Sequence, residues 1–223
     1  MKIRLDFDFE TSIFVKKIEM MLETKIAPLK RKATTPPRRV SLAAYFEAEE
    51  KALHKSEFNN GIITPMAGAK LNHNRLATQA ALLMGVFIFE NDFGYIVSNS
   101  DTKIRIEDFN KVVYPDAVVI CEKPEFFEGR EDTITNPLLI VEVLSFSSKK
   151  HDRETKFEYY RTLPSFREYV LINQERKRVS VATKQPDATW ILRDYDGEES
   201  TAVLYALHNC PLPLNRLYRN IEL

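Results

Sequence analysis

The sequence predicts an α/β fold in which a mixed sheet is flanked by helices. From residue 41 to residue 172 the hydrophobic patterns follow the order helix, strands, helix, strand, with further strand patterns at both ends of the chain. An apolar run from Asn136 to Ser145 has the length and composition of a buried strand. Apolar residues make up 44% of the 223 residues, which is ample for one sizeable core.

The first 40 residues are predicted to form an appendage that ends in a linker. Residues 3–9 alternate between apolar and polar side chains, which is typical of a half-buried strand. The apolar stripe that follows has helical spacing and consists of Phe14, Ile18, Met21 and Leu22. Residues 30–39 carry five positive charges and a Pro-Pro pair, which favours an extended solvated linker over a phosphate-contacting arm. We therefore assign residues 1–40 to a strand-helix appendage with a basic, proline-containing linker, and residues 41–223 to the main domain.

The main domain is expected to begin with a helix, a hairpin and a long helix. Ser41 opens a helical pattern that ends near residue 54. Residues 57–66 form a predicted strand pair with Asn-Asn-Gly at the turn, because Asn-Gly favours positive φ angles. A long helix, capped by Asn72 or Asn74, then runs to about Glu90. Its inward face is expected to consist of Leu76, Ala80, Leu83 and Phe87.

The rest of the chain is predicted to be rich in strands. Six short segments have strand patterns, and these are residues 95–97, 103–106, 112–121, 168–172, 179–183 and 190–195. A polar loop over residues 124–136 leads into the buried apolar strand. A helix is expected from about Asp152 to Thr162, closed by Pro164, and a short terminal helix over residues 211–218.

Glu142 stands in the middle of the buried apolar run. An isolated carboxylate in an apolar interior is costly unless it is paired, protonated or bound to a metal. Asp116, at the start of an earlier apolar run, is the candidate partner of Glu142 at a metal site. Two simpler interpretations stay open: Asp116 caps a turn after Pro115, and Glu142 forms a buried salt bridge with Lys156.

Two carboxylates on neighbouring strands suit metal-dependent hydrolysis of a phosphodiester. This reaction takes oxygen ligands that converge on one divalent ion, together with a nearby cation. Asp116 enters one predicted strand, Glu142 lies in its expected neighbour, and the backbone carbonyl of Val143 adds a third oxygen. Carboxylates, a carbonyl and water are ligands for Mg²⁺ or Mn²⁺.

The cation is expected two residues after Glu142, but position 144 is Leu. The nearest replacements are Lys149, Lys150 and Lys156. On a helix that starts near Asp152, Lys156 and Tyr160 follow one and two turns later on the same face. We prefer Lys156, because a helical lysine is held in place. The alternative is an ordinary exposed pair between Asp152 and Lys156.

An ordered set of motifs adds a resemblance to a known family. The set comprises Tyr114-Pro115-Asp116, Val141-Glu142-Val143-Leu144-Ser145, Asp152 with Lys156 and Tyr160, Glu168-Tyr169, and upstream Glu57, Gly61, Met66-Ala67-Gly68-Ala69 and His73. Over about residues 41–195 the chain resembles the Uma-two family of restriction-endonuclease-like proteins in the PD-(D/E)XK nuclease superfamily. The resemblance implies a restriction-endonuclease-like αβββαβ core, here with extra C-terminal strands, and a divalent metal at Asp116 and Glu142. It also implies a lysine displaced to the following helix, with Glu57 and His73 as supporting residues in the same cleft.

These observations lead to a metal-dependent DNA endonuclease, a hydrolase of phosphodiester bonds, as the expected function. Lys plus Arg and Asp plus Glu number 32 each, so any surface for nucleic acid is local. The alternatives are an inactive nuclease-fold protein that binds nucleic acid or a protein partner, and an oligomeric interaction protein whose carboxylates are structural. The resemblance implies a homodimer, and the N-terminal apolar stripe needs covering. The apolar run 80–89 is half the length of a membrane crossing, and the charged N-terminus is unlike a signal peptide, so we expect a cytoplasmic protein.

Overall fold

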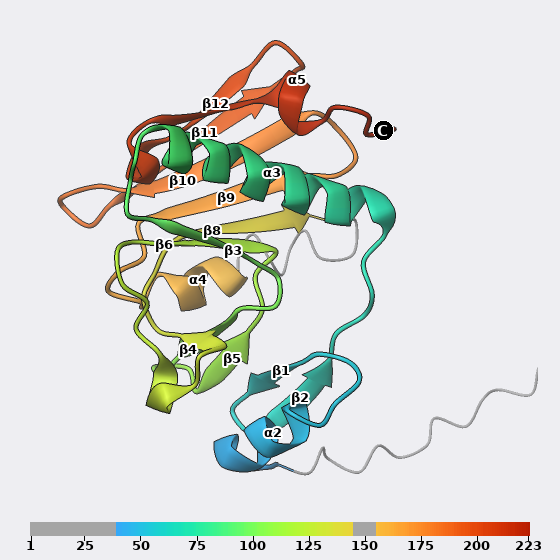
Figure 1. Ribbon diagram of the computed structural model, residues 1–223, viewed down its shortest axis with the longest axis vertical. Helices are drawn as coiled ribbons and strands as arrows, with labels where there is room; N and C mark the ends of the chain where they lie inside the picture. Colours follow the sequence, from blue (N-terminus) through green and yellow to red (C-terminus); the bar gives the residue numbers. More distant parts are fainter. Residues whose placement is uncertain (1–38, 145–154) are drawn as a thin grey trace, which may run out of the picture. The chain divides into compact units, whose positions relative to one another are not determined.

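The computed structural model describes residues 39–144 and 155–223 (Figure 1). The predicted N-terminal strand and helix and nearly all of the basic linker lie outside the described residues. Lys149, Lys150 and Asp152 lie outside them as well. All elements below belong to the unit Arg38–Leu223.

A six-stranded mixed sheet forms the centre of this unit, in the order β11-β10-β9-β8-β6-β3. Its strands are β3 (Ile96–Asn99), β6 (Ala117–Ile120), β8 (Pro137–Leu144), β9 (Glu168–Asn173), β10 (Arg178–Lys184) and β11 (Trp190–Asp196). Only β8 and β9 run parallel, and the other neighbours are antiparallel. In β8 every residue except Leu138 is buried, as the apolar run predicted.

Helix α3 (Leu71–Glu90) packs along one face of this sheet (Figure 1). Its fully buried residues are Leu76, Ala80, Met84 and Ile88, whereas Leu83 and Phe87 are only partly buried against the same core. The first half of the predicted inward face is therefore confirmed. The second half is wrong, because the buried residues are Met84 and Ile88, each one position later than predicted. After Ala80 the buried stripe keeps a spacing of four residues, whereas the prediction took a step of three.

The predicted asparagine cap of this long helix is also wrong. The N-cap is Lys70, which makes no side-chain capping hydrogen bond. Asn72 lies inside the first turn, and its Nδ2 donates instead to the carbonyl of Glu222 at 2.8 Å. The asparagine ties the helix start to the C-terminal end of the chain.

The opposite face of the sheet is covered by helix α4 (Phe157–Tyr160), preceded by a π-helical turn at Thr155 and Lys156. Within the described residues this helix is shorter than the predicted one and ends at Tyr160. Tyr160 packs with Phe166 and Tyr169 in a core cluster distinct from the one under α3. The two faces of the sheet thus support two separate hydrophobic clusters.

A second, five-stranded sheet has the order β2-β1-β5-β4-β7. Its strands are β1 (Ser56–Asn59), β2 (Ile62–Pro65), β4 (Lys103–Ile106), β5 (Lys111–Val113) and β7 (Thr133–Ile134). Helix α2 (Leu42–Glu49), capped by the Ser41 hydroxyl, packs Tyr45 and Phe46 against Phe58. The Asn-Gly turn between β1 and β2 has the predicted positive φ angles, 45° at Asn60 and 93° at Gly61.

The single strand predicted over residues 112–121 is wrong. Its first part is β5 in the smaller sheet and its second part is β6 in the larger one. Pro115 lies between them and has no amide hydrogen to donate to a ladder. The segment Tyr114-Pro115-Asp116 therefore links the two sheets.

The C-terminal part of the chain contains a small hairpin that the sequence patterns did not predict. It consists of β12 (Thr201–Leu204) and β13 (Cys210–Pro213), joined through the 3-10 turn η3 (Tyr205–Leu207). The predicted helix over residues 211–218 is reduced to α5 (Leu214–Leu217). The predicted polar loop 124–136 holds the 3-10 turn η1 (Phe127–Gly129) and β7.

The order α3, β3, β6, β8, α4 and β9 reproduces the expected αβββαβ core, with the strands of the second sheet inserted along the way. The predicted fold class, including extra C-terminal strands, is confirmed. Among the helices of the described residues, none combines the length and apolar character needed to cross a membrane.

Candidate active site

The candidate site forms where β6 begins and β8 ends. In this antiparallel pair the register places Ala117 opposite Val141, so Asp116 and Glu142 lie just beyond the same pair on adjacent strands. Side chains alternate between the faces of a strand. Ile140 and Leu144 belong to the core cluster that contains Tyr160, so Glu142, which lies between them, faces α4. The predicted neighbourhood of the two carboxylates is thereby created by strand register.

Asp116 is held by a helix and by a strand. Its Oδ1 lies 2.8 Å from Nε2 of His73, in the first turn of α3, and its Oδ2 accepts a hydrogen bond from the amide of Val143 at 2.6 Å. The His73 and Asp116 side chains keep 17% and 18% of their surface exposed. The N–H and C=O of one strand residue point to the same side, so the Val143 carbonyl also faces the Asp116 side of β8.

Glu142 lies at the centre of a buried polar network. Its Oε1 accepts hydrogen bonds from the Lys156 ammonium and from the Tyr160 hydroxyl, both at 3.0 Å. Glu142 is 4% exposed and Lys156 is 8% exposed. These bonds compensate the cost of placing a carboxylate in an apolar strand. The salt bridge considered from the sequence as an alternative is present.

The Tyr160 hydroxyl acts as a donor in this network. Complete burial raises its pKa well above the ordinary value for tyrosine, and the negative charge of Glu142 raises the pKa further. The phenol therefore stays protonated at neutral pH. Its hydrogen bond fixes the orientation of the Glu142 carboxylate.

Glu57, near the start of β1, also lies close to the Lys156 ammonium. Its Oε1 is 3.8 Å from the Lys156 Nζ. This oxygen is buried and has no hydrogen-bond partner among the described residues. An unsatisfied buried carboxylate oxygen is uncommon and points to a missing donor or cation. The predicted supporting residue thus lies beside the predicted cation.

Lys111 is a further charged residue near the site that the sequence reasoning missed. It is the first residue of β5, is 7% exposed, and its Nζ lies 4.1 Å from the centre of the Tyr159 ring. Burial lowers the pKa of Lys111, while the charge of Glu57 acts in the opposite direction. The signal in the sequence was a charged residue directly before an apolar run, the same signal that identified Asp116.

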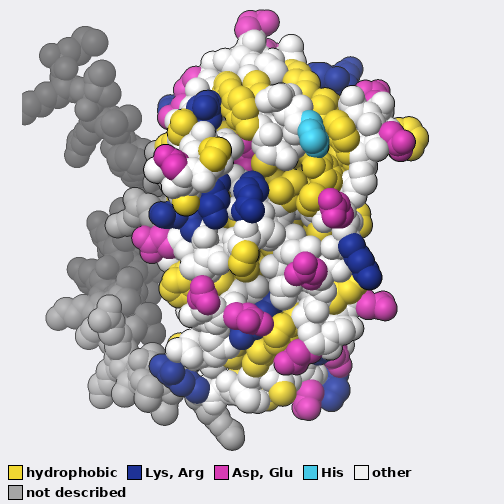
Figure 2. Space-filling view, turned by 90° about the vertical axis from the view of Figure 1, so that its left-hand side faces the viewer, with side chains coloured by type: hydrophobic (Ala, Val, Ile, Leu, Met, Phe, Trp, Pro, Cys, Tyr) yellow, Lys and Arg dark blue, Asp and Glu magenta, His cyan; other side chains and the backbone are white. Residues whose placement is uncertain are grey.

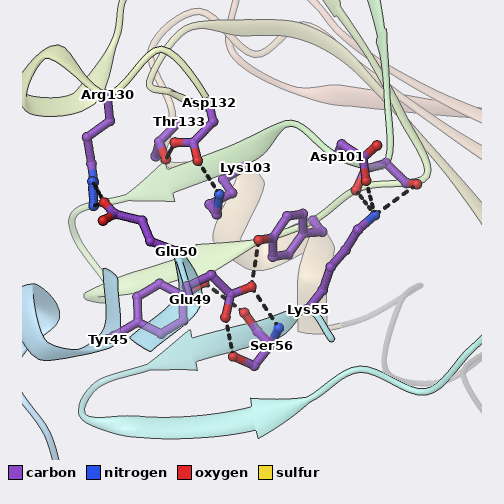
Figure 3. A network of polar contacts seen from close by, with 12 residues as sticks. Tyr45, Glu49, Glu50, Lys55, Ser56, Asp101, Lys103, Arg130, Asp132 and Thr133 are labelled. Carbon is purple, nitrogen blue, oxygen red and sulfur yellow. Dashed lines mark hydrogen bonds and ion pairs between the residues drawn. The ribbon is translucent and has the colours of Figure 1, made fainter. Parts of the chain in front are cut away.

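The segment that carries Asp116 is anchored from the smaller sheet. The Tyr114 hydroxyl donates to Glu49 Oε1 at 2.7 Å, and the Ser56 amide donates to the same oxygen at 2.9 Å. Figure 3 shows Glu49 of α2 facing Ser56, with Lys103 nearby. The Lys103 ammonium lies 5.4 Å from the centre of the Tyr114 ring. These contacts hold Tyr114 two residues before Asp116.

Position 144 does not supply the cation of this site. Leu144, where a lysine would be simplest, is 8% exposed and packs into the cluster of Tyr160. Lys156 reaches Glu142 from the turn before α4 instead. The predicted contribution of Asp152 falls outside the described residues.

The oxygens at the site suit a hard divalent cation. Each carboxylate oxygen has two lone-pair sites, and Asp116 accepts one described hydrogen bond per oxygen. The unsatisfied oxygen of Glu57 adds a nearby carboxylate. Over residues 39–144 and 155–223, no group of three or more His, Cys, Asp or Glu is arranged to hold a metal ion. A metal bound here would need oxygens besides these side chains, such as the Val143 carbonyl and water.

Comparisons with known proteins place the chain in a family. The model of the Uma2 (Uma-two) family, described as "Putative restriction endonuclease", matches residues 42–214. The Synechocystis sp. protein sll1609 is 40% identical over 161 residues, which cover 72% of this chain and 90% of that protein. The Synechocystis sp. protein slr1290 is 29% identical over 168 residues, covering 74% of this chain and 85% of that protein.

A solved structure shares the fold. It is the crystal structure of "a putative nuclease belonging to DUF820" from Anabaena variabilis ATCC 29413. The TM-score is 0.64 at 14% sequence identity, and the match covers 80% of this chain and 97% of the other. At this level of identity the likeness concerns the fold alone.

Proposed function

This chain belongs to the Uma2 family, and we propose that it is a metal-dependent DNA endonuclease that hydrolyses phosphodiester bonds. The family description and the fold shared with a nuclease structure support a nuclease-like function. The observation that carries the finer proposal is the placement of Asp116 and Glu142 at adjacent strand ends, with the Lys156 ammonium on Glu142.

In this proposal Asp116, Glu142 and the carbonyl of Val143 hold a Mg²⁺ or Mn²⁺ ion. The bound ion would polarise the scissile phosphate and activate water. The hydrogen bond from His73 and the amide of Val143 keep the Asp116 carboxylate in one orientation. A fixed carboxylate costs little reorganisation when it binds its ligand.

Lys156 supplies the positive charge in this site. Its ammonium is held between the carboxylates of Glu142 and Glu57, at 3.0 Å and 3.8 Å. A fixed cation in a partly desolvated site stabilises the negative charge that develops on a phosphate in the transition state. This role replaces that of a lysine two residues after Glu142.

Cleavage of supercoiled plasmid DNA tests the proposal. The protein is expected to nick or linearise the plasmid with Mg²⁺ or Mn²⁺ and to be inactive in EDTA. Asp116→Ala and Glu142→Ala should abolish cleavage, whereas Glu158→Gln, an exposed carboxylate on α4, should cleave like the wild type. Cleavage that survives both alanine substitutions would refute the assignment.

One observation favours a second function, an inactive nuclease-fold protein that binds nucleic acid or a protein partner. Lys156 and Tyr160 both donate to the same oxygen of Glu142, which is a buried network that can serve stability alone. Such a protein would bind DNA with strong dependence on salt, equally well in Mg²⁺ and in EDTA, and would not cut it. A homodimer and a cytoplasmic location remain part of the proposal.

A further inference from the structure

A polar pocket lies at the end of the large sheet opposite to the candidate active site. Its volume is about 280 Å³, and it is lined by Arg167, Thr183, Lys184, Gln185, Arg193, Tyr205 and Ala206. In Figure 1 the β10–β11 turn beside this pocket lies at the left of the sheet, whereas β8 ends at the right. Figure 2 views the molecule from that left side and shows a group of Lys and Arg side chains there. The pocket is therefore separate from the candidate active site.

The pocket has a surplus of positive charge. Arg167 and Lys184 are neighbours on adjacent chain segments, because the Lys184 amide donates to the Arg167 carbonyl at 2.8 Å. Arg193 reaches the same pocket from β11. Among the described residues, no carboxylate lies within ion-pair distance of any of these three cations. Like charges on adjacent strands repel each other unless an anion joins them.

A carboxylate beside the pocket, that of Glu168, is already engaged by other donors. Its Oε1 accepts hydrogen bonds from the Thr183 hydroxyl at 2.7 Å and the Tyr205 amide at 3.0 Å. Its Oε2 accepts from the Ala206 amide at 3.3 Å. Three cations beside the Glu168 carboxyl group leave a surplus of at least two positive charges around the pocket.

The guanidinium of Arg193 is incompletely satisfied. Its centre lies 4.5 Å from the middle of the Tyr205 ring, which holds the planar group against an aromatic face. Its Nη1 is buried and has no hydrogen-bond partner within the part of the chain that the structure describes. A buried charged donor without an acceptor is costly, and a bound anion would satisfy it.

We propose that this pocket binds a phosphate group, with Arg193 as its principal donor and Lys184 and Arg167 as flanking cations. A phosphate monoester carries a charge of about −1.5 to −2 near neutral pH, which matches the surplus around the pocket. Guanidinium groups recognise its oxygens through paired N–H donors. The phosphate belongs either to a free mononucleotide or to a nucleic-acid backbone.

Titration calorimetry in EDTA tests this site without involving a metal at the candidate active site. The full chain is titrated with inorganic phosphate and with a 5′-mononucleotide. Arg193→Gln should weaken binding by about tenfold or more, since a charged hydrogen bond is lost, and Lys184→Gln should weaken it by a smaller factor. Arg176→Gln, an exposed arginine in the β9–β10 turn, is the matched control and should bind like the wild type.

Competition with a short DNA duplex then identifies the source of the phosphate. Displacement of the mononucleotide by the duplex assigns the site to the nucleic-acid backbone, and its absence assigns the site to a free phosphate compound. Circular dichroism confirms that each variant is folded. The proposal is overturned if the wild type shows no binding at about 10 mM phosphate, well above the usual range for specific sites. Equal affinities of the wild type, Arg193→Gln and Lys184→Gln would overturn it as well.

Discussion

Among single residues, the buried pair of Glu142 and Lys156 is central to the candidate site. Both side chains are almost fully buried, and the ammonium donates to the carboxylate at 3.0 Å. Breaking a buried pair by removing one partner leaves a charge that is neither hydrated nor neutralised. The stability of the protein should therefore report on this pair independently of any activity.

Lys156→Met keeps the length of the side chain and removes its charge. We expect the free energy of unfolding to fall by about 3 kcal/mol, because the buried Glu142 carboxylate then loses its ion pair with the Lys156 ammonium. Urea denaturation monitored by circular dichroism measures this loss. Lys51→Met, an exposed lysine after α2, is the control and should change stability by less than about 0.5 kcal/mol.

The double variant Lys156→Met/Glu142→Gln separates two costs, which are the buried charge left on Glu142 and the loss of the Lys156 ammonium itself. A neutral amide at position 142 removes the buried charge of Glu142, so the double variant should recover part of the stability that the single variant loses. A single variant as stable as the wild type would show that the pair is not buried in solution.

At the scale of elements, Glu168 joins β9 to the turn η3. Its side chain accepts hydrogen bonds from Thr183 on β10 and from the backbone of Tyr205 and Ala206. Desolvation by burial nevertheless raises its pKa from the ordinary 4.5 to about 7, and the nearby Arg193 offsets this only in part. The carboxyl group of Glu168 therefore ionises near neutral pH in the folded protein.

This shift predicts how stability changes with pH. The folded state holds a proton on Glu168 between about pH 4.5 and about pH 7, where the unfolded state has released it. The stabilisation that comes from Glu168 is fully present below about pH 4.5 and is lost as the pH rises through about 7. Thermal melts of the wild type should show a melting temperature that decreases across this window.

Glu168→Gln removes the titrating carboxyl group from β9. Its melting temperature should be less dependent on pH between about 4.5 and about 7 than that of the wild type. Glu158→Gln, on the exposed side of α4, keeps Glu168 and should retain the wild-type slope. A wild-type slope in Glu168→Gln would assign the pH dependence to another group.

At the scale of the whole molecule, periodicity and strand register explain what the sequence could predict. The apolar run around Glu142 was recognisable as a central strand, and its place beside Asp116 followed from adjacent strands. The division of residues 112–121 between two sheets was not recognisable, because both halves are rich in β-branched residues and only Pro115 separates them. Contacts between distant segments, such as those that form the pocket around Arg193, were not recognisable from the sequence either.

The sequence predicts which residues could form the candidate site, but it does not predict how they contact one another. His73 and Asp116 are far apart in sequence, and their hydrogen bond depends on the start of α3 at Leu71 instead of at an asparagine cap. The pairing of Lys156 with Glu142 was one of several alternatives, because the lysine precedes the described helix α4 and side-chain direction there depends on local turns. Lys111 was missed because its strand begins one residue earlier than the apolar pattern.

A metal bound at Asp116 and Glu142 should stabilise the whole molecule, because a ligand that binds the folded state alone adds RT ln(1 + [L]/Kd) to the free energy of unfolding. Addition of Mn²⁺ to metal-free protein should raise the melting temperature, and EDTA should reverse the shift. At a hundredfold excess over Kd the gain is about 2.7 kcal/mol, which corresponds to a shift of about 5–11 °C for a domain of this size. Asp116→Ala and Glu142→Ala should lose the shift, while Glu158→Gln keeps it. A wild-type melt that does not respond to Mn²⁺ would instead favour carboxylates with a purely structural role.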